Sequence, residues 1–165
     1  MKEKREKALI VIFLGLTTGL AIFLGYTTYV WVTIGNIFNN LDENTTINNI
    51  EISTQNNTTS MNVTITIANP YACSHVNIYI VLKALTIDNK TISLYDYYKG
   101  QLSGTFGNLH VPPNSNATIK FKFNLPQNSL DIQEPQNITL NIRILATTII
   151  NEGKPQTIEF EKHYQ

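Results

Sequence analysis

The chain has 165 residues, of which 12 are basic and 12 acidic, so its formal net charge is zero. A neutral chain gives no reason to expect nucleic acid or another polyanion as a partner. The single cysteine, Cys73, excludes a disulfide-rich scaffold and is either a small buried side chain or an exposed thiol. Burial is the favoured interpretation, because free cysteine is among the most buried residue types.

The first predicted element is a transmembrane helix over residues 8–34, through which we expect the chain to contact the lipid bilayer. The stretch from Ala8 to Val32 has 25 residues and no charge; as a helix it would be about 38 Å long, against a hydrocarbon core of about 30 Å. Aromatic side chains of the kind that prefer the interface cluster near its end: Tyr26, Tyr29 and Trp31.

Charge predicts the orientation of this helix. Residues 1–7 contain four basic and two acidic side chains, which makes them a basic leader. By the positive-inside rule we expect the leader to be cytoplasmic and the chain beyond about Asn36 to be extracellular. A cleaved signal peptide is the alternative, but its apolar core would span about 7–15 residues and end in a small-x-small site, which is missing here. We therefore expect an uncleaved signal anchor in the cell membrane.

Gly15 and Gly19 form a G-x-x-x-G pair within the predicted span. Such small residues let two membrane helices approach closely, so these glycines are a candidate helix–helix contact in a homodimer. Glycine is also common in membrane helices that do not pair in this way.

Beyond the helix, residues 35–46 are polar and predict a short irregular stalk, and residues 47–165 predict one extracytoplasmic domain. Apolar and polar side chains then alternate with the period of a β-strand, and turn residues separate the runs. The predicted strands are Ile47–Ile52, which is not cleanly phased, and Met61–Ile67, Val76–Leu82, Ile92–Leu94, Leu102–Phe106, Ile119–Leu125, Ile138–Ile144 and Ile158–Phe160. A short helix within residues 128–136 is also compatible with the sequence.

Seven or eight short strands, each with one apolar face, predict an all-β fold. The expected architecture is an antiparallel two-sheet sandwich of the immunoglobulin or fibronectin-III kind, preceded by the transmembrane helix.

Four motifs resemble the group 2 late-embryogenesis-abundant proteins, whose module is also called the water-stress-and-hypersensitive-response (WHy) domain. In chain order they are Asn69-Pro70-Tyr71, Val111-Pro112-Pro113, Leu125-Pro126 and Ile142-Arg143-Ile144-Leu145-Ala146. The resemblance covers about residues 47–163 and departs from the family at Ile144, where glycine is frequent. It implies a non-enzymatic, stress-protective domain similar to archaeal, membrane-anchored members of the family.

The Asn69-Pro70-Tyr71 motif predicts a corner where the chain leaves one sheet. Pro70 cannot donate to a strand ladder and holds Asn69 extended. The Asn69 side chain can then close a turn onto nearby backbone, and Tyr71 can fold back over the end of the sandwich.

The sequence contains no catalytic constellation, and no cofactor is expected. None of the three histidines shares a short spacing with another, and Cys73-x-His75 lacks a third metal ligand nearby. Nucleophile elbows, phosphate-binding loops and Glu-x-x-His motifs do not occur. We therefore predict that the protein is not an enzyme.

Two other features could act in recognition or modification. Tyr95, Tyr97 and Tyr98 form a cluster that is either an interaction surface or a half-buried edge strand. Asparagines that begin Asn-x-Ser/Thr sequons are candidate glycosylation sites: Asn44, Asn56, Asn57, Asn62, Asn89, Asn116 and Asn137.

Two functions remain as hypotheses. The first is a membrane-anchored, non-enzymatic sandwich with a stress-protective or protein-interaction role in the envelope. The second is a component of an archaeal surface filament, either type IV pilin-like or an archaellum accessory protein. Lys7-Ala8 before Leu9 loosely resembles a prepilin cleavage site and motivates the second hypothesis.

Overall fold

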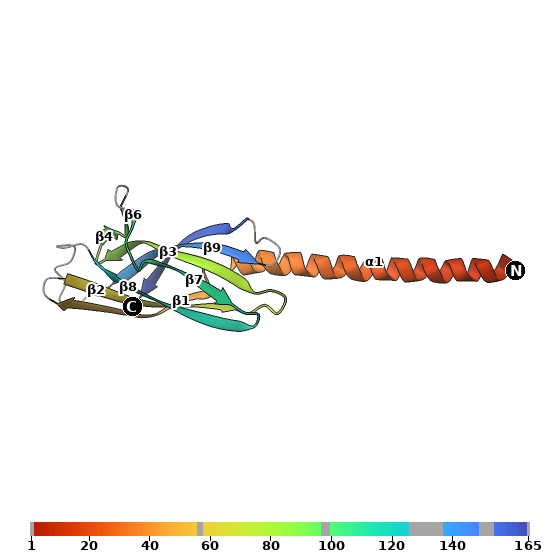
Figure 1. The fold of residues 1–165 in the computed structure, drawn as a ribbon, viewed down its shortest axis with the longest axis horizontal. Coiled ribbons are helices and arrows are strands. Elements are labelled where there is room, and N and C mark those ends of the chain that lie inside the picture. Colours follow the sequence, from red (N-terminus) through yellow and green to blue (C-terminus); the bar gives the residue numbers. More distant parts are fainter. Residues whose placement is uncertain (1, 56–57, 97–99, 126–136, 149–153, 165) are drawn as a thin grey trace. The chain divides into compact units, whose positions relative to one another are not determined.

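The computed structural model describes the chain except for residues 1, 56–57, 97–99, 126–136, 149–153 and 165 (Figure 1). The chain divides into two units, Met1–Asn36 and Ile37–Gln165. The helix and strands are α1 Lys2–Asn39, β1 Thr45–Gln55, β2 Thr58–Asn69, β3 Val76–Ile87, β4 Lys90–Ser93, β5 Tyr95–Asp96, β6 Gly100–Gln101, β7 Phe106–Val111, β8 Ser115–Asn124, β9 Ile138–Thr148 and β10 Gln156–Tyr164. The helix predicted within residues 128–136 lies outside the described residues.

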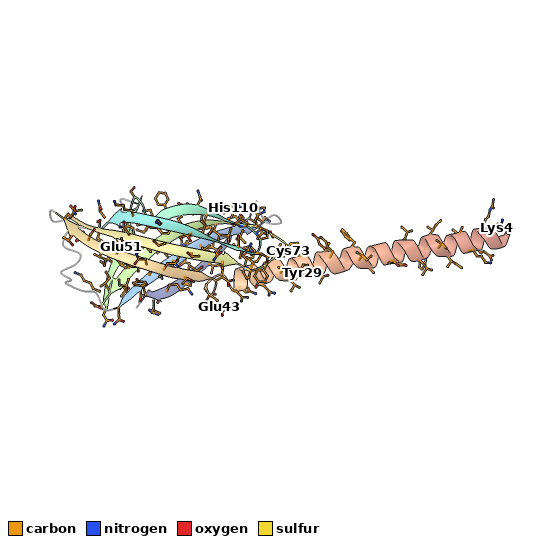
Figure 2. All side chains as sticks on the ribbon, turned by 90° about the horizontal axis from the view of Figure 1, so that it is seen from below. Lys4, Tyr29, Glu43, Glu51, Cys73 and His110 are labelled. Carbon is orange, nitrogen blue, oxygen red and sulfur yellow. The ribbon has the colours of Figure 1, made fainter. Side chains whose placement is uncertain are left out.

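The first unit consists of helix α1, which is long and apolar enough to cross a membrane. From Leu9 to Tyr29 its large apolar side chains are exposed, Phe13 and Leu16 among them. Figure 2 shows side chains projecting from the helix along its length. The hydroxyls of Thr17, Thr27 and Thr33 donate to backbone carbonyls of the preceding helical turn. Thr17 Oγ1 lies 2.9 Å from the carbonyl oxygen of Phe13. This pairing matters because hydrocarbon offers a hydroxyl no other partner.

The second unit is built around two antiparallel sheets, and β5 and β6 pair as a separate two-stranded sheet. One has three strands in the order β1-β2-β8; the other has five, in the order β10-β9-β3-β4 with β7 also paired to β3 (Figure 1). Their apolar faces form one buried cluster that includes Ile65 from the first sheet and Ile80 and Ile142 from the second. The predicted all-β domain of two antiparallel sheets after an apolar helix is therefore confirmed.

The residues predicted as an irregular stalk are ordered instead. Helix α1 continues to Asn39, and Ile37 and Leu41 are buried in the core of the second unit. These two side chains are four residues apart, so the helical period places them on the same side. The Thr45 hydroxyl donates to the carbonyl of Leu41 at 2.6 Å, which satisfies a backbone acceptor after the helix ends.

Residues 102–105 form a turn, so the predicted strand Leu102–Phe106 is wrong. Gly104 has φ +82°, a left-handed conformation that glycine adopts without strain. The Thr105 hydroxyl donates to the carbonyl of Leu102 at 2.6 Å and closes the turn. The strand of this region is β7, which begins at Phe106.

The corner predicted at Asn69-Pro70-Tyr71 is confirmed. Asn69 is buried, and its amide nitrogen donates to the carbonyls of Ser74 at 2.8 Å, Pro112 at 3.2 Å and Val111 at 3.4 Å. Tyr71 packs against the core, and its hydroxyl accepts from Asn40 at 3.2 Å. One amide therefore ties the end of β2 to the turn between β7 and β8.

Candidate functional site

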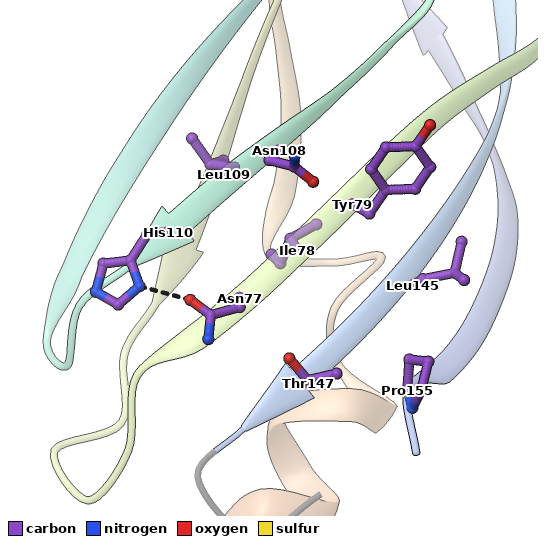
Figure 3. A pocket seen from close by; sticks show the side chains of 9 residues that line it. All are labelled: Asn77, Ile78, Tyr79, Asn108, Leu109, His110, Leu145, Thr147 and Pro155. Carbon is purple, nitrogen blue, oxygen red and sulfur yellow. Dashed lines mark hydrogen bonds between the residues drawn. The ribbon is translucent and has the colours of Figure 1, made fainter. Parts of the chain in front are cut away.

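A hollow of about 580 Å³ lies on the outer face of the five-stranded sheet. It is called the sheet-face hollow below and is lined by Asn77, Ile78, Tyr79, Asn108, Leu109, His110, Leu145, Thr147 and Pro155 (Figure 3). Its volume falls within the range of about 300–1,000 Å³ that is typical of small-molecule sites.

The strand register assembles this hollow from adjacent rows. Tyr79 on β3 lies between Asn108 of β7 and Leu145 of β9. Asn77, two residues earlier, lies between His110 and Thr147. Successive side chains of a strand point to opposite faces, so Asn77 and Tyr79 share the outer face while Ile78 and Ile80 are buried.

A hydrogen bond fixes the polar end of the sheet-face hollow. His110 Nδ1 lies 2.6 Å from Asn77 Oδ1 (Figure 3). An amide oxygen only accepts, so Nδ1 carries the proton, and Nε2 of the neutral ring is an acceptor. The Asn77 amide nitrogen then remains a donor at the rim, and the ring of His75 lies 5.1 Å from that of His110.

Of the described residues that line the sheet-face hollow, none is Lys, Arg, Asp or Glu. The outer face of the other sheet differs, because a hollow of about 340 Å³ there includes Glu51, Lys120 and Lys122 in its lining. The sheet-face hollow therefore offers amides, an imidazole and a phenol to a ligand, but no ionised side chain to balance a formal charge.

Aromatic side chains continue along the same sheet face. The rings of Tyr79 and Phe106 lie 6.2 Å apart, and Phe106 is 46% exposed. Tyr95, which is 51% exposed, borders a second hollow of about 310 Å³. Val81 and Arg143 of the same sheet face also line that second hollow. Among the described residues beyond α1, Phe106 and Tyr95 are the large apolar side chains that remain exposed.

An ion cluster contributes to the lining of the second hollow through Lys83 and Arg143. Glu159 of β10 accepts from Lys83 Nζ at 2.9 Å and from Arg143 at 2.5 Å. The hydrogen bond from Lys83, followed by that from Arg143, lowers the pKa of the Glu159 carboxyl. All three side chains are substantially exposed, so the cluster shapes the surface potential more than it stabilises the fold.

Of the predicted tyrosine cluster, the structure places Tyr95 on this sheet face, in the short strand β5. Tyr97 and Tyr98 lie outside the described residues. Gly15 and Gly19 lie on α1. A Cβ added at either glycine would meet no other atom of this chain within 4 Å, so this side of the helix has room for a second helix.

The sequons differ in accessibility. Asn89, Asn116 and Asn137 are exposed, whereas Asn44 and Asn62 are half-buried; Asn56 and Asn57 lie outside the described residues. Asn62 also donates to Glu51 at 3.3 Å. Asn89 lies in the turn between β3 and β4, and Asn137 directly precedes β9. The Asp88 amide of that turn donates to the Asn137 carbonyl at 3.1 Å.

Cys73 is half-buried, which corrects the expectation of burial. It lies in the open corner segment before β3, where its neighbour Ser74 is buried instead. Within the part of the chain that the structure describes, no three His, Cys, Asp or Glu side chains come together in a way that could hold a metal ion.

Sequence reasoning missed the residues of the sheet-face hollow, although part of the signal was present. Asn77 and Tyr79 alternate with buried isoleucines in a strand that was predicted, so their outward direction could be read from the pattern. Asn108 and His110 could not be placed, because strand β7 was assigned to the wrong residues.

No family model matches this chain, and neither does any curated protein. A crystal structure of a protein from Archaeoglobus fulgidus aligns with 73% of this chain and 97% of its own, at 14% identity and a TM-score of 0.34. Similarity at that level assigns neither a fold family nor a function.

Proposed function

We propose that this chain is a non-enzymatic, single-pass membrane protein whose β-domain faces the cell exterior and serves the envelope by binding another envelope component. The observation that carries the proposal is the placement of charge around helix α1. Lys4, Arg5 and Lys7 lie at its first turns, and its last turn has no basic residue. After Lys7 the next basic residue along the sequence is Lys83.

This asymmetry determines the proposed orientation. Lysine and arginine near a membrane helix are retained on the cytoplasmic side, so the end that carries Lys4 stays inside and the β-domain is exported. The exposed sequon residues Asn89, Asn116 and Asn137 are then the candidate glycan acceptors on the exterior surface.

The proposal also includes the finer class of the domain, an immunoglobulin- or fibronectin-III-like sandwich related to the WHy family. The connections from β2 to β3 and from β7 to β8 each pass from one sheet to the other, as they do in sandwiches of this kind. The Asn69-Pro70-Tyr71 corner at the end of β2 is the family-like feature with a structural role, because its amide bridges three backbone carbonyls.

A surface-filament subunit is the second candidate, and one observation favours it. Helix α1 runs unbroken from Lys2 to Asn39, and from Leu9 to Tyr29 its large apolar side chains are exposed. Such a helix could pack against identical helices in a filament core as well as against lipid. Filament assembly would require removal of the basic residues ahead of Leu9, which otherwise remain at the cytoplasmic face.

Fractionation of the native protein separates the two candidates. We expect the protein to stay in the membrane pellet after an alkaline wash, and its intact mass to include Lys4 to Lys7. Recovery from sheared extracellular fibres of a mature chain beginning at Leu9 would replace the anchored-domain proposal with the filament one.

A further inference from the structure

The strongest unassigned feature is the sheet-face hollow together with the aromatic side chains beyond it. Among the residues that the structure describes, its lining has no ionised side chain, so a charged ligand would lose hydration without gaining a counter-charge from them. Its polar groups are neutral amides, an imidazole and a phenol, which pair well with ligands that both donate and accept hydrogen bonds. Hydroxyl groups on an uncharged ligand meet this requirement.

The apolar part of the sheet-face hollow requires a ligand with a non-polar side as well. Tyr79 is half-buried between Leu145 and Asn108, and the tilted ring of Phe106 lies next to it. Aromatic side chains combine a large apolar face with a polar edge and suit ligands that are themselves amphipathic. A pyranose ring has such a character, with a C–H face and a hydroxyl rim.

The spacing of the aromatic side chains suggests more than one sugar unit. Val81 lies opposite Phe106 in the register, two residues beyond Tyr79, and also borders the second hollow with Tyr95. The exposed rings therefore follow strand β3 from one hollow to the next. Exposed aromatic rings on one face can each bind the apolar side of a ligand unit.

From these observations we propose that the outer face of the five-stranded sheet binds a neutral saccharide. Tyr79 is the platform for one sugar ring. The Asn77 and Asn108 amides and His110 Nε2 contact its hydroxyls. The chain extends past Phe106 toward Tyr95, where the cations that line the second hollow, Lys83 and Arg143, are paired with Glu159. This assigns a ligand class to the envelope-binding role proposed above and rests on that role for the source of the glycan.

The test uses the full-length protein in phosphatidylcholine nanodiscs, since sugar-headed detergents would compete. The probes are methyl glycosides of glucose, galactose, mannose and N-acetylglucosamine and their β-linked disaccharides, measured by saturation-transfer NMR and titration. We expect at least one neutral probe to bind with about millimolar affinity, and a disaccharide to bind more tightly than its monosaccharide.

Variants locate the site. Tyr79→Ala and Asn108→Ala should each weaken binding about tenfold, and Tyr79→Phe should lose less than Tyr79→Ala because it keeps the ring. Lys122→Ala, on the outer face of the other sheet, is the matched control and should bind as the parent does. Asn108 is exposed, so its variant tests the hollow even if Tyr79→Ala does not fold.

Three results would overturn the inference: no neutral probe binds, only uronic or sialic acids bind, or Tyr79→Ala and Asn108→Ala bind as the Lys122→Ala control does. Photo-crosslinking from Phe106 to an envelope protein in cells, without binding of any sugar, would assign the face to a protein partner instead. Sugar binding is measured on purified protein and does not depend on the orientation in the cell membrane. An absence of sugar binding would therefore leave the proposed membrane topology unaffected.

Discussion

The corner at Asn69 makes a demanding prediction about stability. The side chain is 2% exposed, and its nitrogen lies 2.8 Å from the Ser74 carbonyl and 3.2 Å from the Pro112 carbonyl. Asn69→Ala removes these bonds and leaves the Ser74 carbonyl without that donor, whereas the Pro112 carbonyl still accepts from the Ser115 hydroxyl at 2.8 Å. A buried acceptor left without a donor costs about 1–3 kcal/mol, so we expect a loss of that size in the free energy of unfolding.

Asn69→Asp should be worse than Asn69→Ala at neutral pH although it keeps the shape of the side chain. It replaces the donating nitrogen with oxygen and places a buried carboxylate against carbonyl oxygens, which costs several kcal/mol. Protonation at acidic pH gives the group one O–H donor again, so part of the stability lost relative to the parent should return.

The assay is denaturant unfolding of the full chain in nanodiscs, followed by the β-sheet signal in circular dichroism. Asn124→Asp is the matched control, because Asn124 is exposed on β8 and the same substitution there should change stability by about 0.5 kcal/mol or less. Equal stability of Asn69→Asp and Asn124→Asp would refute the account of the corner.

Three further substitutions probe the turn at Gly104 and the ion cluster. Gly104 and Gly100 both have positive φ, but a Cβ at Gly104 would lie 1.9 Å from the Lys122 carbonyl oxygen whereas one at Gly100 meets nothing within 4 Å. Gly100→Ala should therefore cost about 1 kcal/mol, from backbone strain alone, and Gly104→Ala clearly more; equal thermal midpoints would contradict the close approach. The lowered pKa of Glu159 means that its ion pairs stabilise the fold above the unfolded-state pKa and lose that effect as the pH falls through the folded-state pKa. The thermal midpoint of Glu159→Gln should accordingly approach that of the parent on acidification, and a difference that does not change between neutral and strongly acidic pH would exclude this linkage.

Much of the β-domain could be predicted because its strands alternate cleanly. The imperfect phase of the first strand has a physical explanation in the structure. A bulge between Ile47 and Asn49 adds one residue, so Ile47, Ile50 and Ile52 all pack against the core despite their uneven spacing. A second bulge, between Leu82 and Ala84, likewise brings Leu82 and Leu85 to the same face. Strand predictions that rest on a two-residue period fail where a bulge shifts the alternation. The local residue types did not predict either bulge.

The candidate site could not be predicted as a unit, because it depends on strand neighbours that are distant in sequence. Gly107 and Asn108 are poor strand formers, so the sequence did not predict strand β7. Without β7, His110 had no assigned neighbour, although it lies against Asn77 in the fold. The end of the helix was missed for a related reason, since Ile37 and Leu41 are stabilised by core contacts that a polar local composition does not reveal.

The orientation of the β-domain is the central claim, and cysteine labelling tests it most directly. Cys73 is first replaced by serine, and single cysteines are introduced at Lys4 or at Lys120, both of which are exposed. On intact cells a membrane-impermeant maleimide should label the Lys120→Cys protein, and it should label the Lys4→Cys protein only after permeabilisation. Labelling of Lys4→Cys on intact cells, with Lys120→Cys protected until permeabilisation, would contradict an exterior-facing domain.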